Sequence, residues 1–184
     1  GVVGIWVSAF LVLFLISGLS WAGIWGGKMV QAWSQFPAEK WDAVPLSDDI
    51  HASMNHHRRE VPWALEQTPM PASGSAAGAA GVAGAVTIDS IDALAREIGF
   101  DARYQMNLPQ DDTGVWTLSR DSMNTDSTDP MSDRTVHIDQ HSGNILADVR
   151  YADYSLAGKA MAVGIALHMG TLGLLSVLAN TLVC

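Results

Sequence analysis

The N-terminal stretch is the strongest constraint on the fold, because its first 27 residues contain no Asp, Glu, Lys, Arg or His. A run of this length exceeds the roughly 20 apolar residues that cross a bilayer as a helix. A second apolar run follows at 156–184, where Lys159 and His168 are the ionisable side chains before the terminal cysteine. The pattern predicts a membrane protein with transmembrane helices over 1–33 and 156–184, and with Lys159 reaching toward the interface.

The ends of the sequence indicate a piece of a longer polytopic protein. The chain begins without Met and stops inside an apolar run. A cleaved signal peptide is disfavoured, because the first run has no basic segment before it and is longer than a signal-peptide core.

Nearly all charge lies between the two apolar runs. All 10 Lys and Arg residues stand between positions 28 and 159, the insert carries all 19 Asp and Glu residues, and the net charge of the chain is -9. An acidic chain of this kind is a poor partner for nucleic acid, whose phosphates attract basic surfaces. The lipid bilayer is the expected partner of the apolar runs. Because a long insert can be translocated whatever its charge, we expect it outside the cytoplasm.

The first half of the insert has no sustained hydrophobic period. Residues 34–73 mix prolines, tryptophans and polar groups, which predicts an irregular juxtamembrane segment. Residues 74–86 contain "GSAAGAAGVAGA", a Gly/Ala composition typical of a flexible linker.

The second half, 87–155, has the pattern of a compact α+β module. Apolar residues at three- and four-residue spacing predict an amphipathic helix over 88–98, with Thr87 as its N-cap and Gly99 as its stop. Alternating stretches then predict a small antiparallel sheet of two hairpins. We expect its strands within 102–108, 114–120, 134–140 and 144–151.

The module offers few residues for chemistry. No nucleophile stands near a base, so no catalytic residue is predicted. His51, His56 and His57 form a dense group, but the arginines that follow disfavour a cation, and we expect a solvated loop and no metal site. His137 and Asp139 share one face of a strand, where a solvent-facing polar pair is the usual explanation.

Several stretches together resemble a known family. They are "SGLSWAGIWGG", "VPWALEQTPMPASGS", "IDALAREIGF", "YQMNLPQDDTGVWTLS", "RTVHIDQHSGNILADVRYADYSLAGKAM" and "GIALHMGTLG". In this order they resemble the PepSY-associated transmembrane proteins, which are often described as iron-uptake or iron-regulated membrane proteins. The resemblance covers nearly the whole chain.

The resemblance implies a bacterial inner-membrane protein with a PepSY-like module on the periplasmic side. Some members of the family resemble haem-bearing reductases that pass electrons across the membrane to ferric siderophores. Such chelators hold Fe(III) through hard oxygen atoms, and reduction to Fe(II) weakens that hold.

His168 is the residue that this resemblance singles out. An ionisable side chain within a membrane segment is a functional candidate by default. Nine residues after Lys159, at about 1.5 Å per residue, it lies roughly 14 Å into the bilayer. Gly164 and Thr171, one turn before and after, leave room for a flat macrocycle. The imidazole therefore fits an axial ligand of haem b. Alternatively, it hydrogen-bonds a neighbouring helix.

Two functions remain open at this point. The first is a haem-containing reductase with His168 as cofactor ligand. Because the first apolar run has no histidine, a second histidine ligand would come from helices outside these 184 residues, or else the sixth position of the iron would be open or held by another kind of residue. The second is a non-catalytic, membrane-anchored binding or regulatory protein whose PepSY-like module contacts a protein partner.

Overall fold

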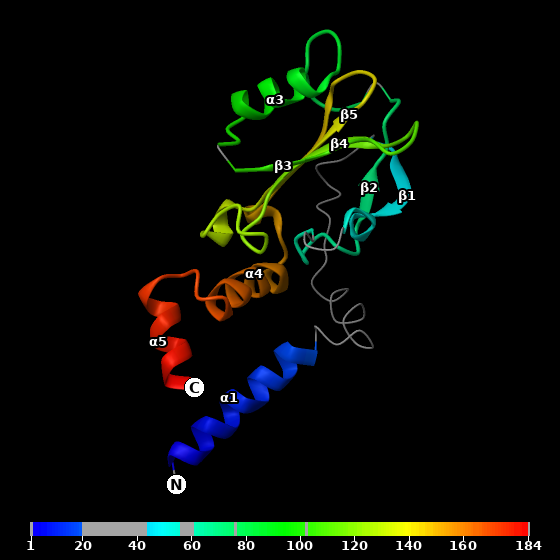
Figure 1. Ribbon diagram of the computed structural model, residues 1–184. Helices are drawn as coiled ribbons and strands as arrows, with labels where there is room; N and C mark the ends of the chain where they lie inside the picture. The colour runs from blue at the N-terminus through cyan, green and yellow to red at the C-terminus, as the bar shows by residue number, and fades with distance from the viewer. Residues whose placement is uncertain (1, 20–43, 56–60, 76, 102, 184) are drawn as a thin grey trace.

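The computed structural model describes residues 2–19, 44–55, 61–75, 77–101 and 103–183 (Figure 1). Its helices are α1 (Val2–Leu19), α3 (Ile88–Glu97), α4 (Leu156–His168) and α5 (Leu174–Val183). Three short 3-10 turns are η2 (His51–Met54), η3 (Pro130–Ser132) and η4 (Tyr151–Asp153). The strands are β1 (Leu46–Ile50), β2 (Pro69–Pro71), β3 (Gln105–Asn107), β4 (Val115–Arg120), β5 (Arg134–Asp139) and β6 (Ile145–Arg150).

The predicted helix and hairpins are confirmed. Strands β3, β4, β5 and β6 pair antiparallel in that order, and each lies within a predicted stretch. Helix α3 begins where expected, because Thr87 and Ser90 form a capping box. The Thr87 side chain accepts a hydrogen bond from the backbone N–H of Ser90, and the Ser90 side chain accepts one from the backbone N–H of Thr87. Gly99, at φ 91°, follows the end of the helix, in a backbone conformation that glycine adopts without strain.

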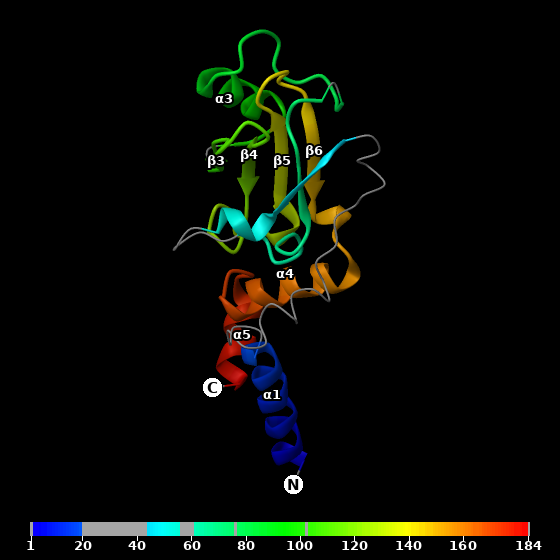
Figure 2. The same ribbon diagram turned by 90° about the vertical axis from the view of Figure 1, so that its right-hand side faces the viewer.

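Helix α3 lies across one face of the sheet (Figures 1 and 2). The core of the module forms between them, where the apolar stripe of the helix meets alternate residues of the two central strands. Its buried members are Ile91, Leu94, Ala95, Phe100, Trp116, Leu118, Val136 and Ile138.

The opposite face of the sheet is covered by the segment predicted to be irregular and juxtamembrane. Its described parts, 44–55 and 61–73, form the two-stranded β1–β2 sheet and the η2 turn, and they pack on the four-stranded sheet. Leu65 is fully buried against Ala147 and Val149. These short elements stand where the sequence predicted irregular structure, because the segment buries scattered residues one by one and has no period that a sequence pattern can show.

The Gly/Ala stretch is docked against the module, contrary to the prediction of a flexible linker. Ala79 exchanges backbone hydrogen bonds with Ile145 at 2.8 and 2.9 Å, and the Val82 N–H donates to the Gly143 carbonyl at 2.9 Å. A Cβ on Gly81 would lie 2.3 Å from that same carbonyl oxygen. The small residues thus permit close backbone approach, while Val82 packs against the core.

The C-terminal apolar run forms two helices, where the sequence predicted one over 156–184. Helix α4 ends at His168 and α5 begins at Leu174. Gly170 and Gly173 between them have φ of 77° and 66°, values outside the helical range. The two glycines therefore explain the break.

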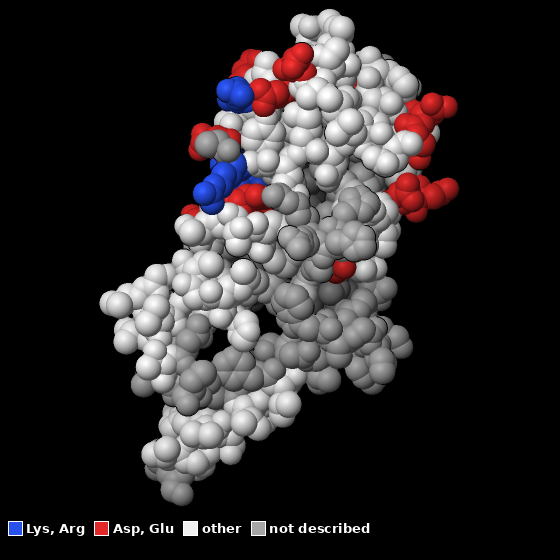
Figure 3. Space-filling view, viewed as in Figure 1, with Lys and Arg blue, Asp and Glu red and all other residues white. Residues whose placement is uncertain are grey.

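Within the described residues, no helix is both long and apolar enough to cross a membrane. The predicted span over 1–33 includes α1, and its residues 20–33 lie outside the described ranges. Figure 3 shows that charged side chains gather on the module, whereas the visible surface of α1, α4 and α5 carries almost none. Large apolar side chains lie exposed there, among them Val3, Leu156 and Leu174.

Candidate functional site

His168 is the last residue of α4 and begins the break between the two C-terminal helices. The break is held by its own polar groups, because the Thr171 hydroxyl donates to the Ala166 carbonyl at 3.0 Å and Ser176 Oγ accepts from the Leu172 N–H at 3.1 Å. The sequence had indicated a position in the middle of a helix. The imidazole instead lies at a turn, at the end of α4.

The surface around His168 is exposed and sparsely filled. His168 itself is exposed, and a Cβ built on Gly164 or Gly170 would find no atom within 4 Å. The sequence predicted open space beside Gly164, and the structure agrees. Thr171 was predicted to continue the helix after His168, but it lies in the break between α4 and α5. A planar group or another helix has room to approach this surface.

A second site lies where the module meets α4. The 121–133 loop, the chain near Trp63 and one face of α4 enclose a cavity of about 20 Å³. Such a volume holds one water molecule or a small ion. Its polar lining is unusual for a buried position: Asp121 is 1% exposed, Asp133 3% and Tyr154 3%.

Both carboxylates of this cavity are fixed by donors from the 121–133 loop. Asp121 accepts from the Met123 N–H at 2.8 Å and from the Asn124 amide at 3.0 Å. Asp133 accepts from the Ser122 N–H at 2.8 Å and from the Ser122 hydroxyl at 3.3 Å. Burial raises the pKa of Asp133 to about 7, and burial together with the charge of Asp133 raises the pKa of Asp121.

Two other histidines are completely buried and meet between the sheet and its covering segment. His51 of η2 and His137 of β5 approach with their Nε2 atoms 2.8 Å apart. His51 Nδ1 lies 2.9 Å from the Thr68 carbonyl oxygen, and His137 Nδ1 lies 2.8 Å from Thr117 Oγ1.

The partners determine where the protons of this pair lie. A carbonyl oxygen only accepts a hydrogen bond, so His51 Nδ1 carries the proton of that ring. His51 Nε2 is then unprotonated and accepts a hydrogen bond from the Nε2–H of His137. His137 Nδ1 then accepts from the Thr117 hydroxyl. Burial lowers the pKa of His51 to about 4, and burial followed by the charge of His51 lowers the pKa of His137. Both rings are therefore neutral near pH 7.

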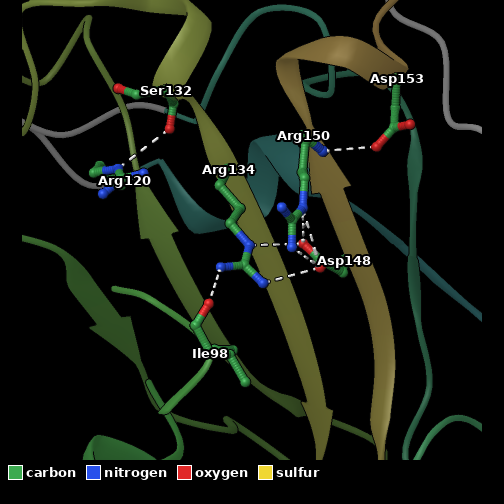
Figure 4. A network of polar contacts seen from close by, with 7 residues as sticks. All are labelled: Ile98, Arg120, Ser132, Arg134, Asp148, Arg150 and Asp153. Atoms are coloured by element: carbon green, nitrogen blue, oxygen red, sulfur yellow. Dashed lines mark hydrogen bonds and ion pairs between the residues drawn. The ribbon is translucent and has the colours of Figure 1, made fainter. Parts of the chain in front are cut away.

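Two arginines form a network of ion pairs at the end of the sheet nearest α4 (Figure 4). Arg134 makes a bidentate ion pair with Asp148 at 2.8 and 2.9 Å, and Arg150 shares the same carboxylate at 2.9 Å. The Arg134 guanidinium also lies 5.0 Å from the centre of the Phe100 ring. Asp148 of β6 thus binds both guanidinium groups and ties β5 to β6 at this end of the sheet.

Comparison with known proteins decides the family. The family model described as the PepSY-associated TM region matches residues 1–184. The chain belongs to this family. No curated protein and no solved structure shows significant similarity to it. Membership in the PepSY-associated TM region family identifies the chain as a membrane-associated PepSY protein, in agreement with the resemblance seen in the sequence.

The sequence predictions for individual residues of this PepSY-associated protein had mixed outcomes. The solvent-facing pair was wrong, because His137 and Asp139 are both 0% exposed. Asp139 instead accepts from the backbone of Gly74 and His141 and so fixes the turn after β5. His51 is buried and does not lie in a solvated loop.

The other two residues of the predicted histidine group, His56 and His57, are outside the described residues. In the described part of the chain, no three His, Cys, Asp or Glu side chains converge as metal ligands would. The sequence gave no signal for the pairing of His51 with His137, which are 86 positions apart. Asp121 and Asp133 stand at the ends of the polar stretch 121–133, where nothing in the sequence marks them as buried.

Proposed function

We propose that this PepSY-associated protein forms part of a haem-containing reductase of the bacterial inner membrane, which passes electrons across the membrane to ferric siderophores in iron acquisition. The module would lie on the periplasmic side. The observation that carries this proposal is the exposed imidazole of His168, on an apolar helix beside the open space at Gly164.

His168 fits one axial position of haem b. A neutral imidazole is a good ligand for haem iron, and the open space at Gly164 and Gly170 suits a flat ring. A second histidine ligand would come from another helix or another chain, because the other described histidines lie in the module (His137 and His141) or in the segment that covers its sheet (His51). Bound haem would supply a one-electron relay, whose potential depends on its ligands and on burial.

The apolar helices would then keep the cofactor away from water, and the module would receive the ferric chelate or a partner protein. Reduction of Fe(III) to Fe(II) weakens its hold on hard oxygen ligands and releases it from the chelator. The net charge of -9 gives an anionic chelate no electrostatic attraction to the chain as a whole, so docking would depend on local groups.

Visible absorption spectra test this function. The protein is purified in detergent after expression with ample haem supply, and spectra are taken oxidised and dithionite-reduced. Sharp reduced b-type bands, weakened in His168→Ala but present in the matched control His141→Ala, support the proposal. The reduced protein should then reduce a ferric siderophore, measured by trapping Fe(II). Absence of haem from the wild type would refute it.

A regulatory or binding role is the second candidate, favoured by the direct connection between module and helix. Strand β6 passes through η4 into α4, and Tyr154 is buried at the junction. A protein partner that binds the module would thus act directly on an apolar helix. Haem-free wild-type protein that captures such a partner through residues 87–155 would favour this role over the reductase.

A further inference from the structure

The cavity between the module and α4 has the composition of a cation site. Asp121, Asp133 and Tyr154, which are all buried, are among the residues that line it. Among the described residues, no ion pair includes either carboxylate. Buried carboxylates without such a partner are rare in proteins unless they are neutralised or bind a metal ion.

Tyr154 provides the second, independent observation. Its hydroxyl oxygen is buried and has no hydrogen-bond partner in the structure. Buried hydroxyls nearly always have one, because burial without a hydrogen bond is costly. Since Tyr154 lines the cavity beside both carboxylates, its oxygen is available to a ligand held there.

The chemistry of the lining narrows the class of ligand. Carboxylate and hydroxyl oxygens are hard donors, which suit Ca²⁺, Mg²⁺ and Mn²⁺. The cavity volume of about 20 Å³ is sufficient for a single ion. The loop donors Met123, Asn124 and Ser122 already fix the carboxylates, as the outer partners of metal ligands commonly do.

We propose that Asp121, Asp133 and Tyr154 bind a divalent metal cation with hard oxygen ligands, with water completing the coordination. The cation lies against the face of α4 formed by Gly158, Met161 and Ile165, so it ties the 121–133 loop to the helix that leaves the module. This site is separate from His168 and requires no haem.

Binding is measured on the full chain in detergent, after treatment with a chelator and its removal. The probes are CaCl2, MgCl2 and MnCl2 by calorimetry and thermal unfolding. TbCl3 is added because Tb³⁺ occupies oxygen sites of the Ca²⁺ type and emits when an adjacent tyrosine or tryptophan is excited. We expect at least one divalent ion to bind and raise the unfolding temperature, and Tb³⁺ emission excited through Tyr154 or Trp63.

Three variants locate the site. Asp133→Asn removes one charge and should weaken binding by about tenfold or more. Tyr154→Phe keeps the ring packed and should weaken binding by a smaller factor. Asp112→Asn, at an exposed position, is the matched control and should bind like the wild type.

Either of two results overturns the proposal. One is the absence of binding of Ca²⁺, Mg²⁺ and Mn²⁺ at millimolar concentration, which would leave the carboxyl pair neutralised by protons. The other is undiminished binding in both Asp133→Asn and Tyr154→Phe, which would place the ion elsewhere. Both readouts are independent of haem, so failure here leaves the proposed reductase function untouched.

Discussion

Protonation of the buried pair of His51 and His137 should remove one contribution to the stability of the module as the pH falls. Each ring is held neutral, and a proton added to His51 Nε2 would face the N–H of His137 across 2.8 Å. The pKa of His51 is about 4 in the folded chain and 6.5 as its ordinary value. Because the folded pKa is the lower one, the unfolded chain binds protons first as the pH falls.

The size and pH range of the effect follow from these two values. The contribution of His51 to stability is present in full above the ordinary pKa and is lost progressively as the pH falls toward 4. A difference of one pKa unit corresponds to about 1.4 kcal/mol, so the loss from His51 alone is about 2 kcal/mol at pH 5 and about 3 kcal/mol at pH 4. His137, whose pKa is lowered in the same direction, adds to this loss.

The assay is urea unfolding of the full chain in detergent at a series of pH values, followed by tryptophan fluorescence, to which the buried Trp63 and Trp116 contribute. The double variant His51→Leu/His137→Val removes both titrating rings and keeps the site apolar. Burial raises the pKa of Asp133 and Asp121, so these carboxyl groups stabilise the folded chain as the pH falls and oppose the loss from the histidines. The test therefore compares the wild type with the double variant, and the difference between their free energies of unfolding should change by about 2 kcal/mol between about pH 7 and 5. The exposed-site variant His141→Asn should keep the wild-type slope. A difference between wild type and double variant that stays constant over this pH range would refute the argument.

Three further predictions concern the packing of the module. Gly81→Ala should destabilise it by about 1–3 kcal/mol, because the new Cβ meets a backbone oxygen at 2.3 Å; Gly164→Ala, where space is open, should be neutral or stabilising in thermal unfolding. Arg134→Ala should cost about 2–3 kcal/mol in urea unfolding, because the Arg134 side chain is only 9% exposed and forms a bidentate ion pair with Asp148. Arg96→Ala, in an exposed i,i+4 pair, should cost less than about 0.5 kcal/mol. Thr87→Ala should cost about 1 kcal/mol and increase hydrogen exchange in the first turn of α3, as it removes the N-cap. Equal effects within either matched pair, or an unchanged exchange rate for Thr87→Ala, would contradict these assignments.

Local patterns predicted the parts of the fold that depend on local physics. The helix that starts at Thr87 has a cap, a stop and an apolar stripe in consecutive sequence, and the four strands alternate between two environments. Segment 44–73 has no such period, because it packs along the sheet through individual side chains such as Leu65. Its place on the sheet is a tertiary outcome.

Composition alone was misleading in two places. Gly and Ala are typical of linkers, yet near Gly81 they are needed for close contact with Gly143. A polar loop is expected to be solvated, yet Asp121 and Asp133 are buried where the loop meets α4. In each case the deciding contact comes from a segment distant in sequence, which a pattern within one stretch does not include.

The junction between β6 and α4 has a mechanical consequence. Only the η4 turn, Tyr151–Asp153, and the cap residue Ser155 with its buried neighbour Tyr154 separate strand from helix. The Tyr151 N–H is bonded to the Asp133 carbonyl at 3.0 Å, and Lys159 Nζ donates to the Ala152 carbonyl at 2.7 Å. With so little slack, a tilt or rotation of α4 is transmitted to the sheet as torque. A spectroscopic label attached to the module should therefore report a change in the orientation of α4.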